Sequence, residues 1–375
     1  MRNSSLPTVP AHAQRRIRVA AAISKPTIIA LVIALIITGT AIAQQHTGVA
    51  EPTLTLQNSG TANGLIAVSA VDARVVWACG KNGTFTTTTD GGETWKAGVV
   101  AGAESLQFRD VHAVSEKVAY LLSVGDHPGD FRIYKTTDGG ASWTMQFHNE
   151  KAKAFYDCFA FWTPTRGIAH SDSVAGVFPD LRTTNGTTWR DISDKLPAAL
   201  PGEGSFASSG TCVATQGQQN AWIATGGASV SRVLVTRNGG ERWTAYQTPL
   251  KSSQGAGAFT VAFRDARNGI IGGGNLDPKH PNDAAAATSH DGGKTWALTN
   301  KPPVTGAIYG LSYVGGAHSR VVVITANDGG AAWTPDEGVT WSKLSAVSGY
   351  WGVAFAGPEA GWLVGNDGRI LKIRF

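Results

Sequence analysis

The residues best suited to binding or chemistry lie in a few long segments between predicted strands. The segments "GDHPGD" (125–130), "HSDSVAGVFPD" (170–180) and "GNLDPKHPND" (274–283) carry aspartates and histidines, and "DKLPAALPGEGSF" (194–206) adds Glu203. Carboxylates and imidazoles bind polar ligands, transfer protons or coordinate metals. With residues of two predicted strands, they form the candidate binding face: Arg109, Asp110, Asp126, His127, Tyr156, Asp157, His170, Asp172, Glu203, Asp277 and His280.

These residue types do not by themselves specify a reaction. The nine histidines show no repeated metal-ligand spacing, and the grouping of Asp277, His280 and Asp283 lies between prolines that favour an ordered surface loop. No glycine-rich phosphate loop opens a predicted helix. We therefore predict no catalytic residue, no metal and no cofactor. Acids, imidazoles and aromatic rings together suit a polar ligand or a peptide.

Residues 1–43 have the organisation of a secretory signal. They contain five basic residues and no acid, followed by an apolar run over residues 28–37 and the triplet "AIA" at 41–43. We predict cleavage after Ala43 and export to the periplasm or the extracellular space, with no stable membrane insertion afterwards. An uncleaved anchor is the alternative, although the apolar run is short for a spanning helix.

The charge balance argues against a nucleic-acid partner. The chain has 32 basic and 27 acidic residues, and its pI is about 9.1. Five of the basic residues belong to residues 1–43, so the remaining chain carries equal numbers of both signs. The high pI is thus mainly a property of the N-terminal segment, and we predict no nucleic-acid binding.

A turn motif recurs along residues 44–375 and indicates the elements that position the candidate face. The pattern Ser/Thr-x-Asp-x-Gly-x-Thr/Ser-Trp occurs four times, and two degenerate copies carry Asn185 and Asn238 in place of the aspartate. The motif tryptophans follow one another at intervals of 45 to 54 residues. Such spacing predicts an array of small sheets. The intact copies contain Asp90, Trp95, Asp138, Trp143, Asp291, Trp296, Asp336 and Trp341.

The physical chemistry of the motif favours a structural role. An aspartate at the tip of a turn can accept hydrogen bonds from unpaired backbone N–H groups, and glycine adopts the positive φ that such turns require. The tryptophan ring can then pack beneath the hairpin. The motif resembles the Asp-box, or bacterial neuraminidase repeat, of β-propellers. That resemblance implies a hairpin between the third and fourth strands of a blade, away from the binding face.

Seven apolar strands precede or follow these motifs, and they predict seven blades. They begin near residues 65, 108, 156, 211, 259, 309 and 351. The last unit ends after its third strand, whereas "PTLTLQN" (52–58) is a lone strand. We predict that the lone strand completes the C-terminal blade and closes the ring, which removes exposed sheet edges. Residues 44–375 are thus expected to form one all-β, seven-bladed propeller.

Within Asp-box propellers, the sequence is similar to the photosystem II assembly and stability factors and their bacterial relatives. "ARVVWACGKNGTFTTTTDGGETW" (73–95) and "EAGWLVGNDGRILKI" (359–373) carry that similarity. It implies an assembly-factor-like scaffold with a binding role. We predict a protein or a glycan as the ligand, and a monomeric protein. The alternative is a sialidase-like or other glycan-active hydrolase or lyase, but the Arg-Ile-Pro motif that a sialidase resemblance requires does not occur.

The three cysteines are Cys79, Cys158 and Cys212. Cys158 and Cys212 have the same register in their predicted strands as apolar residues of other blades, which favours buried thiols that fill space between blades. A disulfide between them is the alternative, and export would permit it. It would require a close approach of two neighbouring blades.

Overall fold

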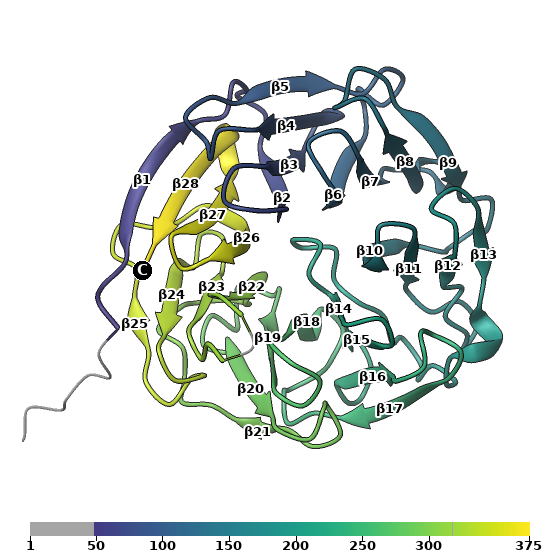
Figure 1. Cartoon of the computed structure of the whole chain (residues 1–375). Coiled ribbons are helices and arrows are strands. Elements are labelled where there is room, and N and C mark those ends of the chain that lie inside the picture. Colours follow the sequence, from purple (N-terminus) through teal and green to yellow (C-terminus); the bar gives the residue numbers. More distant parts are fainter. Residues whose placement is uncertain (1–48, 317) are drawn as a thin grey trace, which may run out of the picture. The chain divides into compact units, whose positions relative to one another are not determined.

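The computed structural model describes residues 49–316 and 318–375, and these form seven four-stranded antiparallel sheets arranged as the blades of a propeller (Figure 1). The predicted signal segment, residues 1–43, lies outside the described residues. Blades one to three contain β2 (Leu65–Ala70), β3 (Val76–Gly80), β4 (Thr84–Thr88), β5 (Lys96–Val99); β6 (Gln107–Ala113), β7 (Ala119–Val124), β8 (Arg132–Thr136), β9 (Thr144–His148); and β10 (Tyr156–Thr163), β11 (Arg166–Ser171), β12 (Leu181–Thr183), β13 (Trp189–Asp191).

The remaining blades repeat this order from the centre outward. Blades four to six contain β14 (Val213–Gln216), β15 (Asn220–Thr225), β16 (Arg232–Thr236), β17 (Trp243–Gln247); β18 (Ala256–Phe263), β19 (Gly269–Asn275), β20 (Ala285–Ser289), β21 (Ala297–Leu298); and β22 (Gly310–Tyr313), β23 (Val322–Thr325), β24 (Ala331–Thr334), β25 (Ser342–Lys343). Blade seven contains β26 (Tyr350–Gly357), β27 (Ala360–Gly365), β28 (Arg369–Arg374) and β1 (Thr53–Asn58). Three short 3₁₀ helices lie in connections: η1 (Pro128–Asp130), η2 (Ser193–Lys195) and η3 (Asn366–Gly368).

The first and last strands share a blade. β1 pairs antiparallel with β28, in a register that runs from Thr53 opposite Arg374 to Asn58 opposite Arg369. The N-terminal strand is therefore the outermost strand of the blade that holds the C-terminus (Figure 1). The structure confirms the prediction of an all-β, seven-bladed propeller.

Each of the four intact motifs forms the same hydrogen-bonded hairpin between the third and fourth strands of its blade. In blade two, the Thr136 hydroxyl donates to Asp138 Oδ1 (2.8 Å), and Ser142 donates from its backbone N–H (2.9 Å) and its hydroxyl (2.6 Å). These hydrogen bonds lower the pKa of Asp138 to about 2. The same contacts recur around Asp90, Asp291 and Asp336.

The motif tryptophans pack between neighbouring blades. Trp143 of blade two, for example, meets Trp77 and Phe85 of blade one edge-on, with ring centroids 6.1 and 5.2 Å apart. Trp189, Trp296 and Trp341 likewise pack in clusters shared with the preceding blade. Each hairpin thereby contributes to the core between two sheets as well as to its own turn.

The favoured interpretation of Cys158 and Cys212 as two buried thiols is wrong. The two residues form a disulfide that links blade three to the start of blade four, with their Cα atoms 6.0 Å apart. Innermost strands converge toward the propeller axis, so neighbouring blades approach within disulfide range there. Cys79 is a buried free thiol.

Candidate binding site

A short segment of the connection between blades three and four contacts blades on both sides of the ring. Residues 205–210, here called the central plug, directly precede Thr211 and Cys212 and extend toward the centre (Figure 1). Arg109 of β6 donates from Nη1 to the carbonyl oxygen of Ala207 (2.9 Å). The hydroxyls of Ser208 and Ser209 donate to the carbonyl oxygen of Tyr309 (3.1 and 2.7 Å). The plug thus joins blade two to the blade on the opposite side of the ring.

Aromatic rings from several blades surround one end of the plug. Phe206 stacks on Phe259 with ring centroids 3.7 Å apart. The ring centroid of Tyr309 lies 6.0 Å from that of Phe259 and 5.0 Å from that of Trp351. These rings border a cavity of about 440 Å³, here called the mouth cavity. Its lining comprises Arg109, Phe155, Asp157, Asp172, residues 205–208, Phe259, Leu276, Tyr309 and Trp351.

Two carboxyl groups and one guanidinium lie together in this lining. Asp157 is the second residue of β10, and Asp172 follows the paired strand β11, so strand pairing places the two carboxyl groups near each other in the cavity lining. Burial raises the pKa of Asp157 well above its usual range, and the neighbouring charge of Asp172 raises it further. Burial also raises the pKa of Asp172 and lowers that of Arg109. Both carboxyl groups are therefore protonated more readily than isolated aspartates.

This cluster is incompletely hydrogen-bonded. Asp172 Oδ1 accepts from the backbone N–H of Ser205 (2.9 Å). Within the described part of the chain, no donor reaches Oδ2 of Asp157 and no acceptor reaches Nε of Arg109, although both atoms are buried. In folded proteins, few buried polar atoms lack a hydrogen-bond partner. The exceptions are often found at functional sites.

A second cavity adjoins the first. It has a volume of about 710 Å³ and shares Asp172, Ser205 and Phe206 with the mouth cavity. Buried Glu203 forms part of its wall and is fully paired: its oxygens accept from Arg232 Nε (2.8 Å) and from the hydroxyl of Thr225 (2.7 Å). Glu203 therefore holds the connection between blades three and four in place.

Three other residues of the candidate face are buried within blade interfaces. The Tyr156 hydroxyl donates to the carbonyl oxygen of Pro179 (2.9 Å). His170 is fully buried, and its Nδ1 hydrogen-bonds to Asp180 (2.9 Å). Asp110 accepts from the backbone N–H of Phe159 (2.8 Å), and burial raises its pKa well above the usual range. These three side chains are buried rather than presented at the surface, because both faces of a blade are covered by its neighbours.

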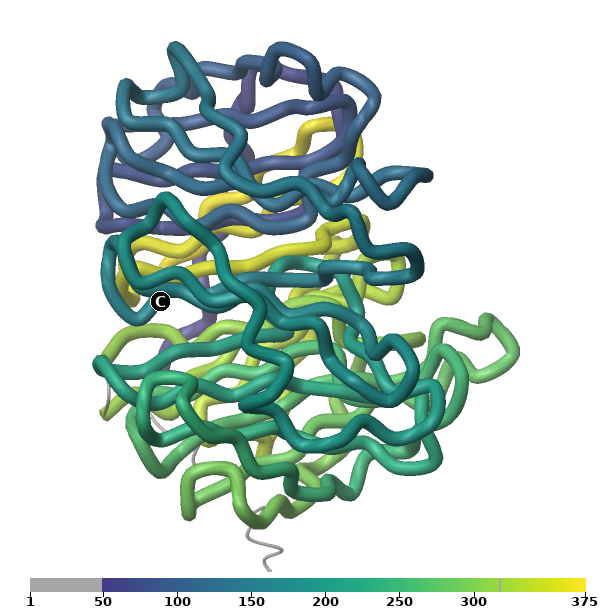
Figure 2. The backbone as a smooth tube through the Cα atoms, turned by 90° about the vertical axis from the view of Figure 1, so that its right-hand side faces the viewer, coloured from purple at the N-terminus to yellow at the C-terminus, as the bar shows by residue number. Residues whose placement is uncertain are grey.

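The remaining candidates are exposed in two separate connections. Asp126 and His127 lie between β7 and β8, and Asp277 and His280 lie between β19 and β20. Figure 2 shows these connections, in blue and in green, projecting from the same side of the molecule. Asp277 accepts from the backbone N–H of Lys279 (2.9 Å), and His280 Nδ1 lies 3.7 Å from Asp283. The described residues contain no group of three or more His, Cys, Asp or Glu side chains arranged to hold a metal ion.

The aromatic part of the site was not predicted from the sequence. Phe259, Tyr309 and Trp351 appeared only as the first residues of predicted inner strands. A signal was present, because they share a register with Arg109: each stands two residues before an apolar residue of an inner strand, Val111, Val261, Leu311 or Val353. The plug had no comparable signal, since its position depends on contacts across the ring.

No protein-family model matches the chain, and no curated protein matches its sequence. Solved structures do resemble it. A YCF48 structure described as bound to a D1 peptide aligns with a TM-score of 0.60 and 16% identity, over 88% of this chain and 96% of that one. YCF48 from Cyanidioschyzon merolae aligns with a TM-score of 0.59 and 18% identity, over 86% and 98%. The WD40 propeller domain of Doa1 gives 0.53 and 13%, over 86% and 97%. At these identities the likeness concerns the fold.

Proposed function

We propose that this chain is an exported, non-catalytic binding protein that holds a segment of another protein in the mouth cavity. The observation that carries the proposal is the continuous row of rings from Phe206 to Trp351, which comes from four different parts of the chain and borders a cavity. Concave sites with aromatic walls and a few polar groups are typical of ligand recognition.

The proposed location follows from two features. Residues 1–43 have the composition of a secretory signal. The Cys158–Cys212 disulfide fits an oxidising compartment, because cytosolic thiols are normally kept reduced. Within the described residues, we find no helix with the length and apolar character that crossing a bilayer requires.

The structural relatives favour a polypeptide ligand over a glycan. YCF48 has the same type of fold, and one of its structures is described as bound to a D1 peptide. The glycan-active alternative calls for several arginines that converge on a carboxylate, or for two carboxyl groups at least about 5 Å apart across the reacting bond. The described lining of the mouth cavity contains one arginine, Arg109, and its two carboxyl groups, Asp157 and Asp172, come from one pair of neighbouring strands.

An immobilised array of short peptides of varied composition tests the proposal. We expect the purified protein to bind a subset of the peptides, and Trp351→Ala and Phe206→Ala to weaken that binding by roughly 30-fold, the loss typical of an aromatic hot spot. Met145→Ala is the matched control, because Met145 is an exposed apolar residue on the outer strand β9.

The same experiment can contradict the proposal. If both variants of the mouth cavity bind every peptide as tightly as the Met145→Ala control does, the mouth cavity is not the binding site. Circular dichroism of each variant verifies that a loss of binding does not arise from unfolding.

A further inference from the structure

The mouth cavity combines two kinds of group that attract cations. The faces of aromatic rings carry negative electrostatic potential, and Phe259, Tyr309 and Trp351 lie in succession around the cavity. Asp157 and Asp172 belong to the same lining. Rings and carboxylates together are the usual surroundings of a bound ammonium group.

The acid pair lacks the positive charge that would allow both carboxyls to ionise. Two neighbouring carboxyl groups in a buried site hold one proton between them more readily than both ionise, because two negative charges side by side repel each other. Arg109 supplies one positive charge, and its Nη1 is already committed to the carbonyl oxygen of Ala207. Asp157 is 1% exposed, and its Oδ2 has no donor among residues 49–316 and 318–375. One further cation would complete the cluster.

The other carboxyl groups around the pair already have hydrogen-bond donors. Asp110 accepts from the backbone of Phe159, and Asp180 pairs with His170. Glu203 pairs with Arg232. Among these charged and titratable side chains of the described residues, the buried atoms without a partner are Oδ2 of Asp157, Nε of Arg109 and Nε2 of His170. Oδ2 of Asp157 is the one carboxylate oxygen in this set that lacks a donor.

We propose that the mouth cavity accepts a lysine ammonium group of the bound polypeptide, between the aromatic rings and the Asp157–Asp172 pair. This inference rests on the proposed function and names the part of the ligand that the site selects. When the ammonium group enters, the proton shared by the two carboxyls leaves to solvent, and both carboxylates accept N–H donors from the lysine. No covalent bond forms, and the charge of the filled cluster is balanced.

Lysine fits this site better than the other charged side chains. An ammonium group is compact and presents three donors, so it can reach both carboxylates at once. An acidic side chain would meet the acid pair and be repelled. An uncharged side chain would fill the aromatic part of the cavity but leave Oδ2 of Asp157 without a donor.

Calorimetric titration with three matched peptides tests the inference. The probes are the acetylated and amidated pentapeptides Leu-Ala-X-Ala-Leu, in which X is lysine, norleucine or glutamate. We expect the lysine peptide to bind at least about tenfold more tightly than the norleucine peptide, and the glutamate peptide to bind most weakly. Titration in buffers of different ionisation enthalpy should show release of about one proton per bound lysine peptide near pH 7, and none for norleucine.

Isosteric variants assign the effect to the acid pair. Asp157→Asn and Asp172→Asn should remove the proton release and reduce binding of the lysine peptide about tenfold, with norleucine affinity unchanged. Asp172→Asn keeps an oxygen that accepts from Ser205, so the plug remains attached. Glu359→Gln, an equal change of charge at the exposed turn between β26 and β27, is the control and should alter neither.

Each outcome has a distinct meaning. Equal binding of the lysine and norleucine peptides that still depends on Trp351 would overturn the lysine inference and leave the proposed function standing. If neither peptide binds in a manner that depends on Trp351, both proposals fail. A preference for lysine that survives both aspartate substitutions would also overturn the inference.

Discussion

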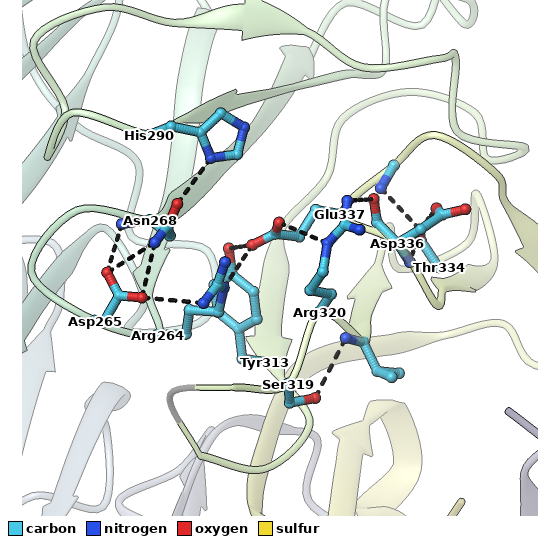
Figure 3. Close-up of polar contacts among 12 residues, drawn as sticks. Arg264, Asp265, Asn268, His290, Tyr313, Ser319, Arg320, Thr334, Asp336 and Glu337 are labelled. Atoms are coloured by element: carbon cyan, nitrogen blue, oxygen red, sulfur yellow. Dashed lines mark hydrogen bonds and ion pairs between the residues drawn. The ribbon is translucent and has the colours of Figure 1, made fainter. Parts of the chain in front are cut away.

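Two clusters of ionisable residues in this propeller differ in how completely their members are paired. In the first, between blades five and six, Glu337 accepts from Arg264 Nε (2.8 Å), the Tyr313 hydroxyl (2.9 Å) and Arg320 Nε (3.2 Å) (Figure 3). Burial raises the pKa of Glu337, but the hydrogen bonds from Arg264 and Tyr313 outweigh that effect and lower it below the usual value. Asp265 adds a second carboxylate to Arg264 at 3.0 Å.

The second cluster, at the mouth cavity, lacks this completeness. Burial raises the pKa of Asp157, and Arg109 of β6 donates from Nη1 to the plug while its Nε has no acceptor among the described residues. The contrast teaches how to separate structural from ligand-binding charge. A network whose members satisfy one another stabilises the fold, whereas buried charge that lacks partners and borders a cavity marks a candidate ligand site.

Backbone geometry supports the structural assignment of the first cluster. Glu337 has a φ of 58°, in the left-handed region, at the position where the other three intact hairpins have Gly91, Gly139 and Gly292. A side chain in that conformation is strained by about 1 kcal/mol or more. The three hydrogen bonds that Glu337 accepts offset this strain.

The largest expected effect comes from the disulfide beside the mouth cluster. Removing it in the Cys158→Ala/Cys212→Ala variant should lower the free energy of unfolding by about 4 kcal/mol, because the bond closes a loop of 54 residues. Urea denaturation measures this change, and limited proteolysis should show increased cleavage within residues 205–210. Wild-type protein under reducing conditions is the control. If the variant matches the oxidised wild type in both its free energy of unfolding and its cleavage pattern, the disulfide does not stabilise the mouth cavity.

The next effect concerns the paired cluster. Glu337→Gln should destabilise the protein by about 3 kcal/mol, because Arg264 and Arg320 lose their buried counter-ion. The carboxylate contributes stability above its unfolded pKa of about 4.3, and this contribution is lost as pH falls through the lowered folded pKa. The difference between variant and wild type should therefore shrink in acid. Urea titrations at several pH values measure it, with exposed Glu359→Gln as the control. A loss equal to that of the control would contradict the comparison.

The smallest effect has the opposite sign. Asp157→Asn should stabilise the protein by about 1 kcal/mol at pH 7, because the wild-type carboxyl has a raised pKa and opposes folding wherever the unfolded chain would ionise it. Wild-type stability falls as pH rises above about 3.9, so the advantage of the variant should vanish near pH 4. Denaturation of both proteins across this pH range, with Asp126→Asn alongside, measures it. A destabilised Asp157→Asn variant at pH 7 would place Asp157 among the structural charges.

The propeller itself was predictable from the sequence because its determinants are local and repeated. Thr136, Asp138 and Ser142 form hydrogen bonds within one turn, so eight consecutive residues determine each of these hairpins. The number of predicted strands then required seven blades, and the lone strand near residue 53 had one position in which to pair.

The site depends on distances that no local pattern encodes. Asp157 meets Asp172 through the pairing of β10 with β11, and Cys158 reaches Cys212 because blades converge at the axis. The aromatic side chains of Phe206 and Trp351 border one cavity only when the circle of seven blades closes. Spacing along the chain thus determined the scaffold, whereas the tertiary structure decided which side chains share a buried space and which of them lack partners.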